Sequence, residues 1–338
     1  MSQQKSNKVS LLHGAGGPAM RQLIESIFLR GVRHPEALAM SDGAALPWGD
    51  KWLVITTDAH TVQPLFFPGG DIGRLSVCGV VNDLAMMGAT DVLALTSAAM
   101  IEEGFDLDQL TRIADSLQEA SVEAAAPILS GDTKVLRHGE IDGLVLSTAG
   151  LGVADRVIRD SGLRVGDAIV ITGTVGDHGL AVLSARHQLG LSSDLRSDVA
   201  PLNGLIAAAM AATGDALHAM KDPTRGGVVS ALSEMAQKAG VQIRLQAPAI
   251  PISAAARAAS ELLGIDPLVV ANEGKALLAV TAQALDDLLR ALHSHRLGRD
   301  ATCIGFVESG ESGALFLDTG FGTRRLLERD GDPLPRIC

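Results

Sequence analysis

The chain has 338 residues, of which 47% are hydrophobic and 20% charged, and its net charge is −11. This length and composition leave room for two domains with buried cores. The negative charge, an aromatic content of 3% and the lack of tyrosine argue against a nucleic-acid-binding surface. Three cysteines are too few for a disulfide framework, so a reducing, cytoplasmic location is expected. We expect neither a signal peptide nor a membrane span, because no apolar leader and no apolar run of about 20 residues is present.

The first half of the chain predicts strands that alternate with helices. Strands are expected at 51–57, 91–100, 127–135 and 141–149, and helices at 20–29, 71–88 and 106–125, on the basis of apolar spacing. The strand at 127–135 is expected to break at Gly131 and Asp132. This order is typical of an α+β layer with helices on one face of a sheet.

A polar, glycine-bearing segment at 154–166 marks the expected domain boundary. Behind it, strands are expected at 167–172, 241–246, 276–281 and 301–307, and helices just after 172 and at 225–239, 254–263 and 283–293. The segment from 319 onward is expected to be irregular because it is rich in Gly, Arg, Asp and Pro. The second half therefore predicts an α/β domain.

The acidic excess is concentrated in the first half of the chain. Residues 1–155 contain 10 Lys/Arg and 19 Asp/Glu, a net charge of −9, whereas 156–338 contain 18 and 20, a net charge of −2. A soluble acidic surface explains this difference, and so does a set of carboxylates that binds a metal ion.

Short aspartate motifs recur at strand ends, in loops and in one apolar helix. The aspartates are Asp42, Asp58, Asp83 and Asp132, the last followed by Thr133 and Lys134. An aspartate at a strand end often only caps a turn. Asp83 is harder to explain in this way because its neighbours are apolar, and a buried carboxylate is costly unless it is paired or metal-bound. Aspartates that converge at one edge of a sheet would suit Mg²⁺, which usually serves phosphates.

Three further turns are candidates for the same site. The turn at 68–73, which includes Gly69 and Gly70, precedes a helix whose free N–H groups can hold an anion. The segment 222–227, which includes Arg225, is equally explained as a helix cap. The Asn-Glu-Gly-Lys turn at 272–275 contains Glu273 and is equally explained as a surface turn.

The chain ends in Pro-Leu-Pro-Arg-Ile-Cys, which is unusual. The two prolines favour an extended segment. Cys78 and Cys303 lie in apolar runs and are expected in the core, whereas Cys338 is the last residue. A terminal thiol is either accidental or carried by an extended arm into a site. It does not fit a prenylation signal, in which the cysteine stands fourth from the end.

Together these segments resemble the HypE family of hydrogenase maturation proteins, which are carbamoyl dehydratases of the aminoimidazole ribonucleotide synthetase and selenophosphate synthetase superfamily. The matching segments span nearly the whole chain in the family's order: 13–17, 41–44, 56–75, 81–89, 129–135, 176–182, 221–227, 272–275 and 335–338. The chain departs from the family at Ser41, often an acidic residue there, and at Ala15, often a glycine. Neither change affects Cys338, so activity is expected to survive.

The resemblance implies a reaction. In that family, a HypF-type carbamoyltransferase places a carbamoyl group on the C-terminal cysteine. ATP then phosphorylates the carboxamide oxygen, and loss of phosphate leaves a thiocyanate. The cyano group passes to the iron of the [NiFe] hydrogenase precursor through the HypC–HypD complex.

The resemblance also implies roles for individual residues. Cys338 would carry the substrate, Lys134 would contact phosphate or the carbamoyl oxygen, and Glu273 would be the general base. Mg²⁺ and ATP would be held by Asp42, Asp58, Asp83 and Asp132, with Gly69, Gly70, Thr133, His178 and Arg225 as further nucleotide-binding residues.

The fold implied by the resemblance is the two-domain PurM-like fold, α+β followed by α/β. It would consist of an N-terminal arm and helix at 1–40, an ATP-binding and dimerisation domain at 41–155, an α/β domain at 156–320 and a flexible tail at 321–338. Two N-terminal sheets would pair into a barrel in a homodimer.

Two alternatives stay open. Another enzyme of the superfamily, such as a small-molecule kinase, a purine-ring cyclase or a selenophosphate synthetase, would turn over ATP without a terminal thiol. Selenophosphate synthetases carry a reactive Cys or selenocysteine near the N-terminus, which residues 1–12 lack. A non-catalytic scaffold for hydrogenase assembly would not turn over ATP, and the intact aspartate and lysine set argues against it.

Overall fold

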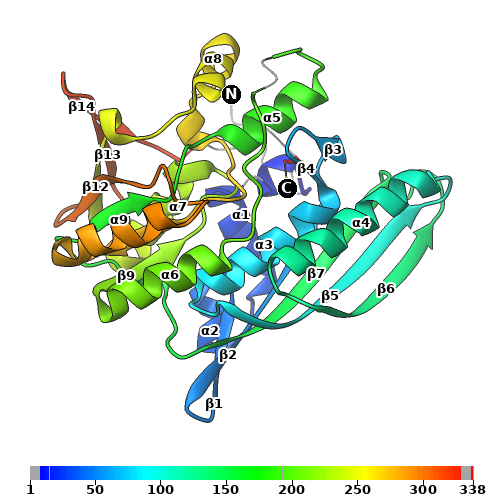
Figure 1. Ribbon diagram of the computed structural model, residues 1–338, viewed down its shortest axis with the longest axis horizontal. Helices are drawn as coiled ribbons and strands as arrows, with labels where there is room; N and C mark the ends of the chain where they lie inside the picture. Colours follow the sequence, from blue (N-terminus) through cyan, green and yellow to red (C-terminus); the bar gives the residue numbers. More distant parts are fainter. Residues whose placement is uncertain (1–7, 15, 192–193, 329–335, 338) are drawn as a thin grey trace.

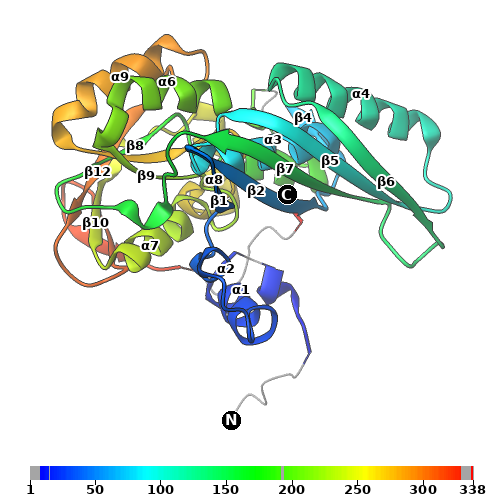
Figure 2. The same ribbon diagram turned by 90° about the horizontal axis from the view of Figure 1, so that it is seen from below.

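The computed structural model describes residues 8–14, 16–191, 194–328 and 336–337. The described residues form two large sheets, each with its own helices, and a short two-stranded one. Figure 2 shows the two large sheets side by side with the N-terminal arm below the junction. The arm contains α1 (Pro18–Leu23), a π-helical turn (Ile24–Phe28) and α2 (Pro35–Ala39). None of the helices in the described part of the chain combines the length and apolar character that a membrane span requires.

The N-terminal sheet has the strand order β1-β2-β7-β5-β6. Its strands are β1 (Ala44–Trp48), β2 (Lys51–His60), β5 (Asp91–Glu102), β6 (Ile128–Leu136) and β7 (Leu144–Ala154). β5 pairs with β6 in parallel, and the other neighbours are antiparallel. Burial alternates strictly along β7, which indicates one covered and one open face. Helices α3 (Ile72–Met86) and α4 (Leu107–Glu123) lie on the covered face (Figure 1).

Helix α3 lies at the centre of the molecule. It packs against β2 and β7 on one side and against α4 and α6 (Asn203–Thr213) on the others. All of its residues are buried except Arg74 and Asp83. An apolar helix surrounded in this way is a rigid support, and Asp83 is the acidic side chain that it presents.

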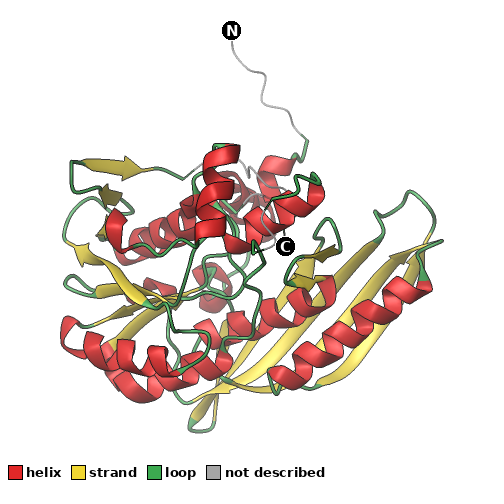
Figure 3. Cartoon of the chain, turned by 45° about the horizontal axis from the view of Figure 1, so that its top comes forward, coloured by secondary structure: helices red, strands yellow, loops and turns green. Residues whose placement is uncertain are grey.

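The C-terminal sheet has the order β14-β13-β10-β12-β8-β11-β9. Its strands are β8 (Ala168–Ile171), β9 (Leu217–Lys221), β10 (Gln242–Gln246), β11 (Leu277–Val280), β12 (Thr302–Glu308), β13 (Leu315–Asp318) and β14 (Thr323–Leu326). Separate apolar cores fill its two faces: α7 (Gly227–Ala239) covers one, and α6 and α9 (Leu285–Ser294) cover the other. The helices and strands of both layers can be followed in Figure 3.

Smaller elements join the two halves. A short strand pair, β3 (Phe66–Phe67) and β4 (Gly70–Asp71), precedes α3. Helices α5 (Asp177–Arg186) and α8 (Ala254–Leu263) contribute to the same apolar cluster as this pair. The penultimate residue Ile337 is 2% exposed in the same apolar cluster. Part of the C-terminal tail is therefore seated between the two halves of the chain.

The expected strands and helices of the first half are present, with two corrections. β6 runs through Gly131 and Asp132 without a break, because parallel pairing with Ser97 and Ala98 of β5 holds it extended. Asp58 lies inside β2 rather than after it, since pairing with β7 extends β2 to His60.

The second half departs further from the expectation. β14 lies in the segment predicted to be irregular from 319 onward, because antiparallel pairing with β13 orders it. The structure also contains elements that the sequence patterns do not predict, among them β9, β13 and α6 in this half and the edge strand β1 in the first half. Cys78 is fully buried as expected, whereas Cys303 is only partly buried.

Candidate active site

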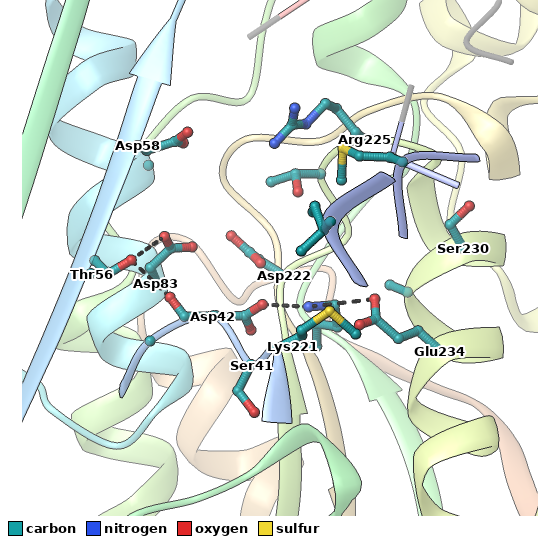
Figure 4. A pocket seen from close by; sticks show the side chains of 18 of the residues that line it. Ser41, Asp42, Thr56, Asp58, Asp83, Lys221, Asp222, Arg225, Ser230 and Glu234 are labelled. Atoms are coloured by element: carbon teal, nitrogen blue, oxygen red, sulfur yellow. Dashed lines mark hydrogen bonds and ion pairs between the residues drawn. The ribbon is translucent and has the colours of Figure 1, made fainter. Parts of the chain in front are cut away.

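A cavity of about 530 Å³ opens where the N-terminal arm, the N-terminal sheet and α7 meet. Figure 4 shows its side chains pointing toward one another from β2, α3, the end of β9 and α7. Asp58 and Arg225 lie at one end, and Ser41, Lys221 and Glu234 lie at the other. The lining therefore combines carboxylates and cations from segments far apart in the sequence.

Three carboxylates converge in this cavity. Asp42, Asp83 and Asp222 each offer one oxygen, and these oxygens all lie within 4.8 Å of one another. Asp42 lies in the turn before β1, Asp83 on α3, and Asp222 directly after β9. The Thr56 hydroxyl lies within hydrogen-bond distance of both the Asp42 carbonyl oxygen, at 2.8 Å, and Asp83 Oδ2, at 2.9 Å, and so ties the first two segments together. Carboxylate oxygens at this spacing are suited to a hard divalent cation.

The electrostatics of the cluster also favour a cation. Burial and the neighbouring charges of Asp222 and Asp42 raise the pKa of Asp83 well above its usual value. Burial and Asp42 likewise raise the pKa of Asp222 to about 7. The carboxylates therefore repel one another when ionised, and a bound divalent ion would relieve that repulsion.

Lys221 already supplies one positive charge. It forms ion pairs with Asp42 and, at 3.9 Å, with Glu234. Burial lowers the pKa of Lys221, but Asp42 and Glu234 outweigh burial and hold that pKa well above its usual value. Lys238 continues the charge network, with Nζ 2.6 Å from Asp160 and 2.9 Å from Glu234. These pairs join the N-terminal segment to α7.

Glu273 lines the cavity near Asp58 and Asp222 and is 3% exposed. Its Oε1 atom has no hydrogen-bond partner among the residues that the structure describes. Burial, followed by the charges of Asp222 and Asp58, raises the pKa of Glu273 well above its usual value. A buried carboxyl oxygen without a partner is costly, which marks Glu273 as a functional candidate.

Three predicted site residues lie elsewhere within the single chain. Asp132, Thr133 and Lys134 are on the edge strand β6 and do not line the cavity. Lys134 Nζ lies 2.8 Å from Asp132 Oδ2, and both side chains are more than 60% exposed. Asp132 therefore does not join the other aspartates, because β6 is separated from β2 by β7 and β5.

His178 does not reach the predicted nucleotide end. Its ring is fully buried against the tail: Nδ1 lies 2.8 Å from Ser197 Oγ and Nε2 lies 2.8 Å from the Ile337 carbonyl oxygen. The position of His178 on the first turn of α5 points it at the tail rather than at the cavity.

The glycine turn at 68–73 does not offer the predicted anion site. The Asp71 carboxylate accepts hydrogen bonds from the N–H groups of Gly73 and Arg74 at 2.8 and 3.1 Å, and so occupies the N-terminus of α3. Gly69 has φ +99° and a Cβ there would lie 2.6 Å from the Ser197 carbonyl oxygen. These glycines allow close packing against Ser197.

The sequence patterns did not identify Lys221, Glu234 or Asp222 as site residues. Lys221 and Asp222 belong to the 221–227 segment, which carried a signal, but capping explained Asp222 equally well. In the structure the N-cap of α7 is Gly226, so Asp222 is left to face the cavity. Glu234 follows its helix pattern and has no local signal. Cys338 lies outside the described residues.

Comparisons with known proteins agree with this architecture. Residues 40–154 match the model of the N-terminal domain of AIR synthase related proteins, and residues 164–318 match that of the C-terminal domain. The fold and the acidic cavity thus define a two-domain AIR synthase related protein. Carbamoyl dehydratase HypE of Rhizobium leguminosarum bv. viciae is 45% identical over 336 residues, 98% of this chain and 96% of that protein.

Two solved structures are similar over the whole fold. One is a HypE–HypF complex, with TM-score 0.86, 42% identity and coverage of 91% of this chain and 99% of that one. The other is HypE in complex with ATP, with TM-score 0.82, 36% identity and coverage of 98% and 100%. The chain belongs to the HypE family of hydrogenase maturation proteins and is a carbamoyl dehydratase.

Proposed function

We propose that this enzyme uses ATP to dehydrate an S-carbamoyl group on its own Cys338, leaving an S-cyano group for the iron of a [NiFe] hydrogenase. Asp42, Asp83 and Asp222 converge in one cavity with the buried Glu273, whose Oε1 atom has no hydrogen-bond partner among the described residues, and this convergence carries the proposal. The carboxylates suit a metal-bound nucleotide, and Glu273 suits a proton acceptor. The solved HypE in complex with ATP supports the nucleotide.

Mg²⁺ is the metal ion that fits the cluster. Asp42, Asp83 and Asp222 would hold it, and Asp58 lines the cavity beside them. When bound, Mg²⁺ would neutralise charge on the phosphates. Arg225 lines the same cavity, and α7 begins beside it without a side-chain cap on its first N–H groups. We propose that Arg225 and this helix start bind phosphate in place of the glycine turn at 68–73.

The chemical step places clear demands on the residues. Transfer of the γ-phosphoryl group to the carbamoyl oxygen converts that oxygen into a leaving group, and release of phosphate with both amide protons leaves the S–C≡N group. The overall change is S-carbamoyl plus ATP to S-cyano plus ADP and phosphate. Glu273 would accept an amide proton, because a carboxylate of raised pKa is a stronger base than an ordinary glutamate.

A homodimer would account for Asp132, Thr133 and Lys134. The open face of the N-terminal sheet carries apolar residues, among them Ile55 and its cross-strand partner Leu151. Asp132 and Lys134 pair with Ala98 and Met100, which continue this face across β5. We propose that two such faces pack together as a barrel, and that Lys134 of one chain serves the cavity of the other.

Partner proteins also enter as proposals. A HypF-type carbamoyltransferase would load Cys338, in keeping with the solved HypE–HypF complex. A HypC–HypD complex would receive the cyano group. We also propose a division into an arm (1–40), two domains (41–155 and 156–320) and a tail (321–338), and a cytoplasmic location.

Mass spectrometry of the intact chain tests this function. After incubation with a HypF-type enzyme, carbamoyl phosphate and ATP, the C-terminal peptide should first gain a carbamoyl group and then lose the mass of water. Cys338→Ala should abolish both changes. ATP hydrolysis without any change at Cys338 would instead favour a small-molecule kinase or a ring cyclase, and no ATP turnover at all would favour a scaffold.

A further inference from the structure

The backbone of Glu273 is hydrogen-bonded through both its N–H group and its carbonyl oxygen. Its N–H group donates to Asp198 Oδ1 at 3.1 Å, and its carbonyl oxygen accepts from Asn82 Nδ2 at 3.0 Å. Asn82 belongs to α3 and Asp198 to the irregular segment before α6, so the two contacts come from opposite halves of the chain. Because Oε1 of Glu273 has no partner among the described residues, these backbone contacts help to fix the place of the side chain.

Asp198 is itself held in place. Its Oδ2 atom lies 3.1 Å from Lys275 Nζ, and its side chain is 5% exposed. Burial raises the pKa of Asp198, but Lys275, His178 and the Glu273 N–H together outweigh burial and hold that pKa below its usual value, so the carboxylate stays charged. A Cβ at Gly274 would lie 1.9 Å from the Asp198 carbonyl oxygen, so the turn and Asp198 are in close contact.

Asn82 is equally well fixed. It is 1% exposed, donates a second hydrogen bond to the Ala200 carbonyl oxygen at 3.1 Å and accepts one from the Leu202 N–H at 2.8 Å. Helix α3 therefore places Asp83 in the carboxylate cluster, while the adjacent residue, Asn82, binds the backbone of Glu273. A fully satisfied buried amide of this kind specifies one arrangement of the segments around it.

We propose that Asn82 and Asp198 are positioning residues for Glu273, holding its carboxyl group at the reacting carbamoyl nitrogen without touching substrate themselves. This inference rests on the proposed role of Glu273 as proton acceptor. General bases act efficiently only within hydrogen-bond reach of the proton that they remove, and small displacements are costly. Lys275 serves the arrangement indirectly, by keeping Asp198 charged and in place.

Single-turnover dehydration of carbamoylated Cys338 at saturating ATP tests the proposal. The variants are Asn82→Ala and the pair Asp198→Ala with Lys275→Met, which leaves no unpaired buried charge. Each is expected to slow dehydration about 10- to 100-fold while the Kd for ATP stays within about threefold. Asp198→Asn with Lys275→Met keeps an acceptor for the Glu273 N–H and should lose much less. The matched control is Asp167→Ala, a buried carboxylate that accepts from the Arg164 N–H and pairs with His218, and it should leave dehydration unchanged.

The decisive comparison repeats both variants in a Glu273→Gln background. If the two residues act through Glu273, each should slow the remaining reaction by less than about threefold there. An equal slowing in both backgrounds, a loss of ATP affinity that matches the loss of rate, or unfolding of both variants at the assay temperature would overturn the inference. Full dehydration by Glu273→Gln alone would instead remove the base from the proposed function.

Discussion

Nε2 of His178 lies 2.8 Å from the carbonyl oxygen of Ile337, the penultimate residue of the chain. The carbonyl oxygen of the preceding residue, Arg336, accepts hydrogen bonds from the Gln63 N–H at 3.2 Å and from Arg186 at 2.6 Å. Arg336 and Ile337 are thus bound by both halves of their own chain, and Ile337 is inserted into the apolar cluster between these halves. Cys338 directly follows this anchored segment in the sequence.

Loss of the anchor should release the tail. Ile337→Ala removes most of a buried side chain, which costs about 2 kcal/mol of docking free energy, or about 30-fold in the docking equilibrium. Trypsin cleavage after Arg336, followed by mass spectrometry of the released C-terminal dipeptide, measures this release and should become faster. Leu107→Ala, at an exposed position on α4, is the control. Equal cleavage of wild type and Ile337→Ala would contradict a docked tail in solution.

Removal of one carboxylate should weaken Mg²⁺ binding and thereby lower ATP turnover. Asp83→Asn is expected to weaken Mg²⁺ binding at least about tenfold and to lower ATP turnover about 100-fold or more, because two charged ligands cannot replace three. Isothermal titration with Mg²⁺ and a phosphate-release assay measure the two effects. Asp108→Asn, an exposed carboxylate on α4, is the matched control. Unchanged Mg²⁺ affinity in Asp83→Asn would exclude the cluster as the metal site.

The stability of the metal-free protein should depend on pH because of Asp222. Its folded-state pKa is about 7, against 3.8 as the ordinary value. Between these values the folded chain retains a proton that the unfolded chain has released, so this group contributes stability that is lost as pH rises from about 4 to 7. The Tm of Asp222→Asn relative to that of the wild type should therefore increase by about 2–4 °C as pH rises from about 5 to 8 in EDTA. A Tm difference that is constant with pH, measured by differential scanning fluorimetry, would contradict the shifted pKa.

Two ion pairs of opposite burial offer a stability test. Asp160 is 2% exposed and binds Lys238 at 2.6 Å and the Ser41 hydroxyl at 3.2 Å. Asp160→Ala leaves Lys238 without that partner in a partly buried place and should lower the free energy of unfolding by about 3–5 kcal/mol. Asp155→Ala breaks the exposed pair with Lys51 and should cost far less, because solvent screens that pair. Urea unfolding measures both losses of unfolding free energy. Equal losses would show that the buried pair contributes no more to stability than the exposed pair.

A charge on the open sheet face should dissociate the proposed dimer. Ile55→Lys introduces an unpaired charge where two sheets would meet, so monomers are expected in analytical ultracentrifugation. Dehydration should fall at least about tenfold with it, because Lys134 of the partner would be lost from the cavity. Leu107→Lys, on an exposed position of α4, should remain dimeric and active. A fully active monomer would place Lys134 outside the reaction.

Much of the N-terminal sheet follows from local patterns. The apolar run of α3 and the strand patterns of β2 and β5 are contained in consecutive residues, and each predicts one element in one place. The break expected at Gly131 failed because pairing with β5 outweighed the local preference of glycine. β14 escaped prediction for the same reason, since Thr-Arg-Arg-Leu is a strand only beside β13.

The sequence by itself determined the family, the aspartate motifs and the candidate base, because these are carried by short segments that keep their order. Only the tertiary structure decided which of them meet. Asp42 and Asp222 are brought together by the packing of two sheets around α3, and Asp132 is kept away by two intervening strands. The Asp71 carboxylate caps the N-terminus of α3 and so occupies the anion site that Gly69 and Gly70 suggested. Convergence of distant side chains depends on packing and strand order, which no local pattern encodes.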